Sequence, residues 1–229
     1  MGTILTRRRY IEIVSNQPGL VGCWLADCAS GRTLIDLSGC NNHGRIVGAV
    51  KVGGKWGQAL SFDGVDDVVS CGASTELNPG ESDFTVEVWF KDYGSPPENR
   101  CVIHKFGPGF FISIFGSTLN FTGGQCSNPG RLSVSGGTIE TGEWYHAVLV
   151  RRREGDTDRL QGFVNGELKG EDTDIATDWS CSVPLRISWN GGSQYFNGTI
   201  SEVRIYARAL SAEEIRWLYE LGRQFYPEV

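Results

Sequence analysis

One short loop of this chain carries residue types that bind a metal ion. It runs from Asp36 to Gly44 with the sequence Asp-Leu-Ser-Gly-Cys-Asn-Asn-His-Gly, and its glycines leave main-chain carbonyls accessible. Ca²⁺ is a hard cation that takes about 6–8 oxygen ligands from carboxylates, amides and carbonyls with loose geometry. We therefore predict a structural calcium site with ligands from this loop: the side chains of Asp36 and Asn42 and the carbonyls of Gly39 and Gly44.

Turn chemistry is the alternative interpretation of these polar segments. An aspartate at the start of a short loop commonly accepts hydrogen bonds from backbone N–H groups a few residues on, so Asp36 would then only cap its turn. A second acidic segment brings Asp63, Asp66 and Asp67 close together in sequence. We interpret these three as turn builders for the same reason.

A second group of residues has the chemistry of a sugar site. Aromatic rings stack on sugar rings and amides bond their hydroxyl groups, often from loops on a rigid scaffold. A subunit interface uses the same residue types, so this alternative stays open. The candidates lie in glycine-rich segments: Gln125, Asn128, Arg131, Trp179, Trp189, Asn190, Gln194, Tyr195 and Asn197.

Residues 84–90 alternate between apolar and other side chains, which predicts a strand with two different faces. The even positions, from Phe84 to Phe90, belong in the core. Glu87 and Trp89 share the other face, where Trp89 would stack on a sugar and Glu87 would accept a hydroxyl proton. The alternative is that a loop covers Trp89, because aromatic side chains are used heavily for packing.

Strands and turns must position these residues. The apolar pattern of residues 199–206 predicts a strand, and Ser211 with Glu214 forms a capping box that begins a short helix. Asn165-Gly166 is the pair best suited to the positive φ angles of a tight hairpin turn. The chain thus predicts many short strands, followed by one helix.

Several motifs in order resemble the laminin-G-like jelly rolls of the concanavalin A-like lectin/glucanase superfamily. The resemblance runs from about Gly19 to Tyr219 and implies an all-β fold, a two-sheet antiparallel β-sandwich with a short C-terminal helix. It divides the chain into an arm of residues 1–18 and a jelly-roll domain of residues 19–229. The motifs that carry it are residues 19–24, 36–44, 57–67, 84–90, 142–148, 163–166 and 197–215.

The resemblance also bears on the calcium prediction and on catalysis. Several superfamily members hold calcium between such a loop and the terminal strand, which adds Glu202 to the predicted ligands; alternatively, Glu202 pairs with an arginine such as Arg204 or Arg45. Other members are glucanases, and retaining hydrolysis needs two carboxyl groups about 5–5.5 Å apart. The sequence has no Glu-x-Asp-x-x-Glu motif, and neither His104 nor His146 has an evident nucleophile partner. We therefore expect no catalytic residues.

Composition limits the partners. The chain has 229 residues, 40% of them hydrophobic, and a formal net charge of −6. With no sustained basic stripe, nucleic acid is not expected as a partner, and we expect Arg151-Arg152-Arg153 at a strand end or hairpin tip in solvent. No apolar run approaches the ~20 residues of a membrane span, so no membrane insertion is expected, and no secretory signal is evident.

The seven cysteines are odd in number and show no Cys-x-x-Cys spacing. This pattern predicts neither a zinc site nor a complete disulfide framework. We expect buried thiols, with one or two disulfides left open.

The arm of residues 1–18 has two interpretations. Its apolar residues predict packing against its own domain or against neighbouring subunits; alternatively, residues 10–14 form an extra strand over a sheet edge. Jelly rolls of this kind without a signal peptide occur in virions. The resemblance therefore suggests a non-catalytic structural, decoration or fibre protein of a virion or surface assembly, which contacts other subunits through the arm and binds cell-surface glycans. The alternative is a free-standing carbohydrate-binding adhesion module; a glycoside hydrolase is less favoured, and the location stays open.

Overall fold

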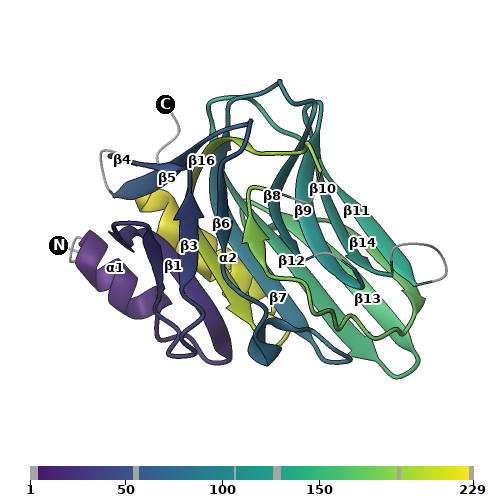
Figure 1. Cartoon of the computed structure of the whole chain (residues 1–229). Helices are drawn as coiled ribbons and strands as arrows, with labels where there is room; N and C mark the ends of the chain where they lie inside the picture. The colour runs from purple at the N-terminus through teal and green to yellow at the C-terminus, as the bar shows by residue number, and fades with distance from the viewer. Residues whose placement is uncertain (1–4, 54–56, 106, 126–129, 190–191, 227–229) are drawn as a thin grey trace.

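A computed structural model describes residues 5–53, 57–105, 107–125, 130–189 and 192–226 (Figure 1). Its strands are antiparallel and follow one continuous hydrogen-bonded order, which folds over at β2 and β1 to make two facing layers. We call the first half of this order the front sheet and the second half the back sheet. The front sheet contains β11 (Arg131–Thr138), β10 (Thr118–Gly124), β9 (Gly109–Phe115), β8 (Asn99–Lys105), β15 (Arg186–Ile187), β6 (Val68–Ser70), β3 (Gly44–Val47) and β2 (Thr33–Asp36).

The back sheet continues this order from β2. Its strands are β1 (Leu20–Ser30), β16 (Asn197–Tyr206), β7 (Phe84–Asp92), β12 (Trp144–Glu154), β13 (Thr157–Val164) and β14 (Glu167–Ile175), with β5 (Gln58–Asp63) and β4 (Val50–Gly53) beside β16. The helices are α1 (Arg7–Val14), η1 (Thr75–Leu77), α2 (Ala212–Gly222) and η2 (Arg223–Phe225). The predicted all-β sandwich with a C-terminal helix is confirmed.

The two ends of the strand order meet. The backbone N–H of Ser133 on β11 donates to Asp172 Oδ2 on β14 at 2.9 Å, and Gly130 N–H donates to Asp174 Oδ2 at 2.8 Å. Side chains therefore close the edge between the sheets where the backbones do not pair.

The core lies between the sheets and follows the alternation of the strands. Phe84, Val86, Val88 and Phe90 are buried in it, as their spacing predicts. The hairpin turn is also as expected: Asn165 and Gly166 have φ angles of 52° and 78° between β13 and β14.

The C-terminal helix covers the outer face of the back sheet. The Ser211 side chain accepts from Glu214 N–H while the Glu214 carboxylate accepts from Ser211 N–H, so the predicted capping box is present. Ile215 and Leu218 pack on Val148 and Phe163 of the sheet.

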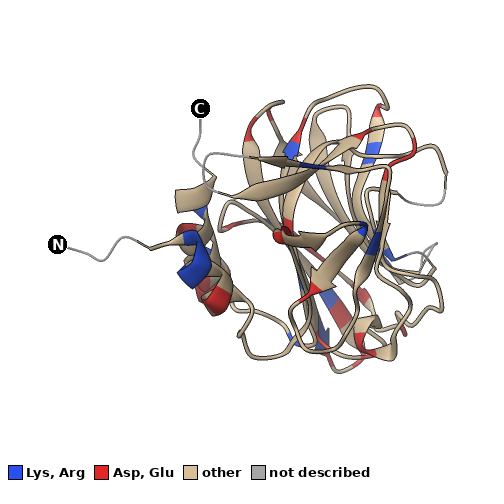
Figure 2. Cartoon of the chain, turned by 60° about the vertical axis from the view of Figure 1, so that its left-hand side comes forward, with Lys and Arg blue, Asp and Glu red and all other residues tan. Residues whose placement is uncertain are grey.

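The arm is a helix, which corrects the strand alternative for residues 10–14. The Thr6 side chain caps α1 by accepting from Arg9 N–H, and the buried residues Tyr10 and Val14 are four apart, on one helical face. Tyr10 OH donates to Glu202 Oε2 at 2.7 Å, and Arg7 pairs with Asp27 at 2.7 Å. The arm therefore packs against its own domain beside β1 (Figures 1 and 2).

The expectation for the arginine triplet is wrong at its first residue. Arg151 is fully buried, although Arg152 and Arg153 are partly exposed near the end of β12. Arg151 forms an ion pair with the equally buried Asp158 at 2.9 Å, and this partner offsets the cost of removing the guanidinium from water.

The six cysteines in the described ranges are free thiols, and Cys23, Cys71 and Cys101 are buried, as expected. Cys126 lies outside those ranges.

Among the helices of the described residues, none has the length and apolar character to cross a bilayer.

Tyr10→Phe should destabilise the protein through the arm. The substitution removes the hydroxyl donor from buried Glu202 and keeps the ring, so we expect the free energy of unfolding to fall by about 1–3 kcal/mol. Urea unfolding measures this, with Arg8→Ala on the exposed side of α1 as the control that stays within about 0.5 kcal/mol. A Tyr10→Phe protein as stable as the wild type would show that the arm contributes nothing through this bond.

Candidate functional site

The outer face of the front sheet carries a continuous row of side chains. From β2 to β11, each member of the row lies opposite the next member on the neighbouring strand. Their sequence neighbours, such as Ile103 and Ile112, are buried in the core, so the row points away from it. We call it the front row: Thr33, Arg45, Ser70, Arg186, His104, Phe111, Thr122 and Ser133.

The front row contains cations and hydroxyl groups and no carboxylate. Arg45 and Ser133 are exposed, and Arg186 and Phe111 are partly exposed. Burial and the charge of Arg186 lower the pKa of His104 to about 4, so its ring is neutral at neutral pH. The row thus offers donors and one aromatic ring to a ligand.

An aromatic and cationic stack stands over the middle of this row. The Trp189 and Tyr195 rings are 5.7 Å apart with an angle of 8° between their planes. Arg186 belongs to the front row, and its guanidinium carbon lies 4.4 Å from the centroid of the Trp189 ring. Trp189 Nε1–H donates to Gly192 O at 2.5 Å, which fixes the indole. Two of the predicted sugar-binding residues, Trp189 and Tyr195, are thus together and partly exposed.

A cleft of about 280 Å³ opens at the end of β9, β10 and β11. Phe111 and Thr122 of the front row line it, together with the predicted residue Gln125 and with Arg131. Its floor depends on glycine, because a Cβ at Gly124, where φ is +90°, would lie 1.9 Å from Gly130 O. A larger residue there would collide with the backbone of Gly130 beside the cleft.

Lys105 lies at the inner end of the same cleft. It is fully buried, its Nζ donates to Val183 O at 2.9 Å, and burial lowers its pKa. The cleft therefore combines apolar walls with several donors.

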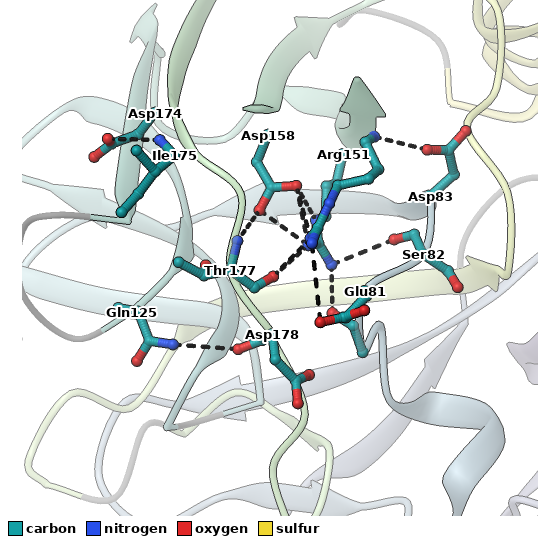
Figure 3. Close-up of polar contacts among 12 residues, drawn as sticks. Glu81, Ser82, Asp83, Gln125, Arg151, Asp158, Asp174, Ile175, Thr177 and Asp178 are labelled. Atoms are coloured by element: carbon teal, nitrogen blue, oxygen red, sulfur yellow. Dashed lines mark hydrogen bonds and ion pairs between the residues drawn. The ribbon is translucent and has the colours of Figure 1, made fainter. Parts of the chain in front are cut away.

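A buried arginine holds the loop beside the cleft (Figure 3). Arg151 donates to Gly80 O at 2.6 Å and to Thr177 O at 2.6 Å, in addition to its pair with Asp158. Gln125 Nε2 donates to Asp178 O at 3.3 Å in the same loop. The loop after β14 is thus fixed to the back sheet at the point where it supports Gln125.

Trp179 belongs to this support and not to the surface, which corrects its predicted role. It is fully buried, 4.3 Å from the Arg151 guanidinium carbon, and a Cβ on Gly123 would lie 2.3 Å from its ring. The glycine above it lets the indole pack directly under β10. The sequence showed a tryptophan in a polar segment but not this burial.

Trp89 and Glu87 do share one face, but helices cover it. Trp89 is 1% exposed and stacks on Tyr226 and Tyr219, with ring centroids 4.4 Å and 5.9 Å away. Because Glu87 is also 1% exposed, neither residue forms an open sugar platform on this face. The covering alternative for Trp89 is the one that the structure shows, with a helix in place of a loop.

Glu87 is the centre of a buried charge cluster. It accepts from Arg204 Nε at 2.9 Å and from Tyr206 OH at 3.0 Å, and its Oε1 lies 2.7 Å from His146 Nε2. Burial by itself would raise the pKa of the Glu87 carboxyl, but Arg204 and His146 outweigh burial and lower it to about 2. His146 thus has a structural partner.

The predicted calcium loop has the contacts of a capped turn. Asp36 accepts from the N–H groups of Cys23, Ser38 and Asn42, each at 2.9 Å, and from Ser38 Oγ at 2.9 Å. Asn42 Nδ2 donates to Val21 O at 3.0 Å. The remaining predicted ligands, Gly39 and Gly44, belong to the same loop and to the start of β3.

Glu202 has a separate set of partners. It accepts from the hydroxyl groups of Tyr10 and Tyr226, and it pairs with Arg7 at 2.8 Å and with Arg204 at 3.5 Å. These cations already balance its charge, which leaves little attraction for another cation. The contacts favour the alternative interpretation of Asp36 and Glu202, and a calcium ion there stays a prediction.

Asp63, Asp66 and Asp67 bring their carboxylate oxygens within 4.8 Å of one another. Asp63 Oδ1 accepts from Val65 N–H at 2.8 Å, and Asp67 Oδ2 accepts from Asp63 N–H at 2.9 Å. These bonds confirm the turn-building role for Asp63 and Asp67, and for Asp66 it stays a prediction.

Three further residues predicted to bind sugar do not contribute to the front row or to its cleft in the described part of the chain. Asn128 and Asn190 lie outside the described residues. Asn197 Nδ2 donates to Gly94 O at 3.1 Å, so it fixes a loop.

The front row itself was not found from the sequence. Phe111, Thr122 and Arg186 lie on three strands that are distant in sequence, and only the alternation of each strand indicated an outward face. Which strands are neighbours depends on register, which short apolar strands do not reveal.

The arrangement is that of a jelly-roll sandwich with an open, carboxylate-free outer row on one sheet. A laminin G model described as concanavalin A-like lectin/glucanases superfamily matches residues 63–216. The chain therefore belongs to this family. No curated protein matches the sequence.

Solved structures share the fold. The binding domain of Paraclostridial Mosquitocidal Protein 1 superposes with a TM-score of 0.73 at 16% identity, over 88% of this chain and 52% of that chain. Domain 4 of the GH43 extracellular arabinanase AbnA from Geobacillus stearothermophilus, in complex with arabinotriose, superposes with a TM-score of 0.67 at 20% sequence identity. The match covers 87% of this chain and 98% of that chain. Trypanosoma rangeli sialidase in complex with sialic acid superposes with a TM-score of 0.69 at 18% sequence identity, and the match covers 94% of this chain and 35% of the sialidase. This chain thus spans about half the length of the mosquitocidal binding domain and a third of the sialidase.

Glu87→Gln should weaken the fold and change its response to acid. Removing one partner of a buried ion pair costs about 3–5 kcal/mol, because Arg204 would remain buried without its carboxylate. The folded carboxyl has a pKa of about 2, below its ordinary 4.5, so its stabilisation is present above about pH 4.5 and is lost as the pH falls toward 2.

Urea unfolding between pH 7 and pH 2 measures both effects. The wild-type free energy of unfolding should fall across that window, and the Glu87→Gln protein should start lower and fall less. Glu140→Gln, at an exposed carboxylate, is the control that keeps the wild-type curve. An acid response of Glu87→Gln as steep as that of the wild type would contradict the assignment.

Proposed function

We propose that this protein is a non-catalytic, lectin-like module that binds a glycan on the front row. The observation that carries the proposal is the Tyr195–Trp189–Arg186 stack next to the cleft lined by Phe111 and Gln125. Registered strands place Arg186 and Phe111 two strands apart, or roughly 10 Å, about the length of two linked sugar rings.

The residue types suit this ligand. Trp189 and Tyr195 present partly exposed rings to the C–H face of a sugar, and the front row adds hydroxyl and guanidinium donors. The cleft of about 280 Å³ is close to the lower end of the usual ligand-pocket range, roughly 300–1,000 Å³. A short oligosaccharide that lies across the strands would use both features.

The similar structures support the class of ligand. The arabinanase domain is in complex with arabinotriose, the sialidase is in complex with sialic acid, and the domain of the mosquitocidal protein is a binding domain. At these identities the likeness is one of fold, so the proposal for this chain depends on its own front row.

A binding role agrees with the partners of the acidic residues. Glu87, Glu202, Asp92 and Asp158 are the buried carboxylates engaged by arginines in the described part of the chain. Hydrolysis by two carboxyl groups needs one of them free to protonate a leaving group. We therefore propose that the protein does not hydrolyse the glycan that it binds.

Trp189→Ala should weaken glycan binding by about tenfold or more, because stacking of one aromatic ring contributes on the order of 1.5 kcal/mol. A glycan array followed by calorimetry on the positive ligands, with arabinotriose and sialylated glycans included, is the measurement. Trp217→Ala is the matched control, since Trp217 is 46% exposed on α2. Wild-type protein that binds no glycan, or equal affinity of the two variants, would contradict the proposal.

The assembly role remains a second candidate because of the way the arm docks. Arg7, Tyr10 and Val14 meet a small set of partners on β1 and β16, and a neighbouring copy offers an identical set. Exchange of such an arm between copies is a low-cost route to an oligomer. A decoration or fibre protein of a virion or surface assembly would use it.

Light scattering on the full chain and on a variant without residues 1–18 tests this candidate. A defined oligomer that the truncation abolishes is the expected result for an assembly subunit. A monomeric full chain would contradict the assembly role and leave the glycan proposal standing. The truncated protein should also unfold at lower urea, because Glu202 loses Arg7 and Tyr10.

A further inference from the structure

A second cleft lies on the opposite side of the molecule from the front row. It has a volume of about 290 Å³ and opens between the end of α2 with η2 and the start of β12. Three aromatic side chains form its walls: Trp144 from β12, Tyr219 from α2 and Tyr226, which follows η2.

The aromatic walls hold one another in place. The Trp144 and Tyr226 ring centroids are 4.8 Å apart, and the Tyr219 ring stacks on Trp89 with an angle of 12° between the planes. Trp144 and Tyr219 are partly exposed. Their rings offer a rigid apolar surface of the kind on which a sugar ring stacks.

Trp89 also lines this cleft, but only 1% of the residue is exposed. Its Nε1–H is buried and makes no hydrogen bond within the described residues. This edge of the indole faces α2, since a Cβ on Gly222 would lie 3.0 Å from Nε1. The helix therefore covers this donor, and the polar contacts of the cleft come from the charged residues at its opening.

Cations surround the opening. Arg223 follows Gly222 directly, and its guanidinium carbon lies 5.9 Å from the Tyr219 ring centroid. Its Nε pairs with Glu220 at 2.7 Å, but both side chains are about half exposed, and such pairs contribute little. Lys91 Nζ lies 5.6 Å from the Trp144 ring. Positive charge at the opening favours an anionic ligand, which can accept charge-assisted hydrogen bonds.

The cleft continues into a wider one of about 630 Å³, with which it shares Asn165, Tyr219 and Arg223. Arg216 and Lys169 lie along the wider part. Its two acidic residues, Glu167 and Glu220, pair with Lys169 at 2.8 Å and with Arg223 at 2.7 Å. The wider part has room for further sugar units beyond the one between the aromatic walls.

We propose that this cleft is a second binding site, which takes one carboxylated sugar residue. The sugar ring packs between Trp144 and Tyr219, and its carboxylate accepts from the Arg223 guanidinium. The site goes beyond the glycan site on the front row and uses none of its residues.

Saturation-transfer NMR on the purified full chain tests the proposal. The probes are D-glucuronate and D-galacturonate, with D-glucose and D-galactose as their neutral counterparts. We expect saturation of the carboxylated sugars and at least about tenfold weaker binding of the neutral ones, because the neutral sugars lack the carboxylate that accepts the charge-assisted hydrogen bond. Arg223→Gln should weaken the binding of the carboxylated sugars about tenfold, and Trp144→Ala should do the same.

Two controls keep the outcomes distinct. Arg8→Gln, at a side chain that is 92% exposed on α1, should bind as the wild type does. Trp189→Ala should also leave this binding intact; if it abolishes the signal, the sugars bind on the front row, and the second site is disproved while the proposed function stands. No binding of the carboxylated sugars, equal binding of the neutral ones, or wild-type binding by Arg223→Gln and Trp144→Ala would each overturn the proposal.

Discussion

The neutralisation of two carboxylates inside the back sheet is the constraint on which the rest of the structure depends. Glu87 on β7 and Glu202 on β16 are both 1% exposed on the sheet's outer face. Arg204, which is paired with Glu87 in the register of β16 and β7, contacts both of them. A buried charge without a partner costs several kcal/mol, so every element that brings a partner is fixed in position. Arg7 and Tyr10 bring α1 to Glu202, and Tyr226 brings the segment after η2.

The same principle fixes loops at both ends of the back sheet. Arg100 and Asp92 are both 1% exposed and form two hydrogen bonds of 2.7 and 2.8 Å, while Arg100 also donates to Gly116 O at 2.7 Å. Arg151 joins Asp158 to carbonyls of two further loops. Each buried arginine thus ties backbone carbonyls from separate segments to one carboxylate. Rigid loops of this kind can hold aromatic side chains at fixed positions without packing them into the core.

The two sheets use their outer faces differently as a result. Helices cover the back sheet because its outer face carries charges that need partners, and a cleft remains where α2 ends against Trp89 and Trp144. The front sheet has hydroxyl groups and arginines on its outer face, and the exposed ones, such as Arg45 and Ser133, are hydrated by water without a covering element. The glycan site that we propose therefore lies on the front sheet, and the second site that we propose lies in the cleft on the back sheet.

The sequence by itself determined the elements whose signals are local. Alternation over residues 84–90 predicted β7, Asn165-Gly166 predicted the hairpin, and Ser211 with Glu214 predicted the start of α2; the structure has all three. Family motifs then identified the sandwich. Tertiary structure alone decided which polar residues are exposed. Trp89, Trp179 and Arg151 are buried, and Trp189 and Tyr195 are not, because burial depends on which distant segment packs over a strand and on whether that segment brings a hydrogen-bond partner.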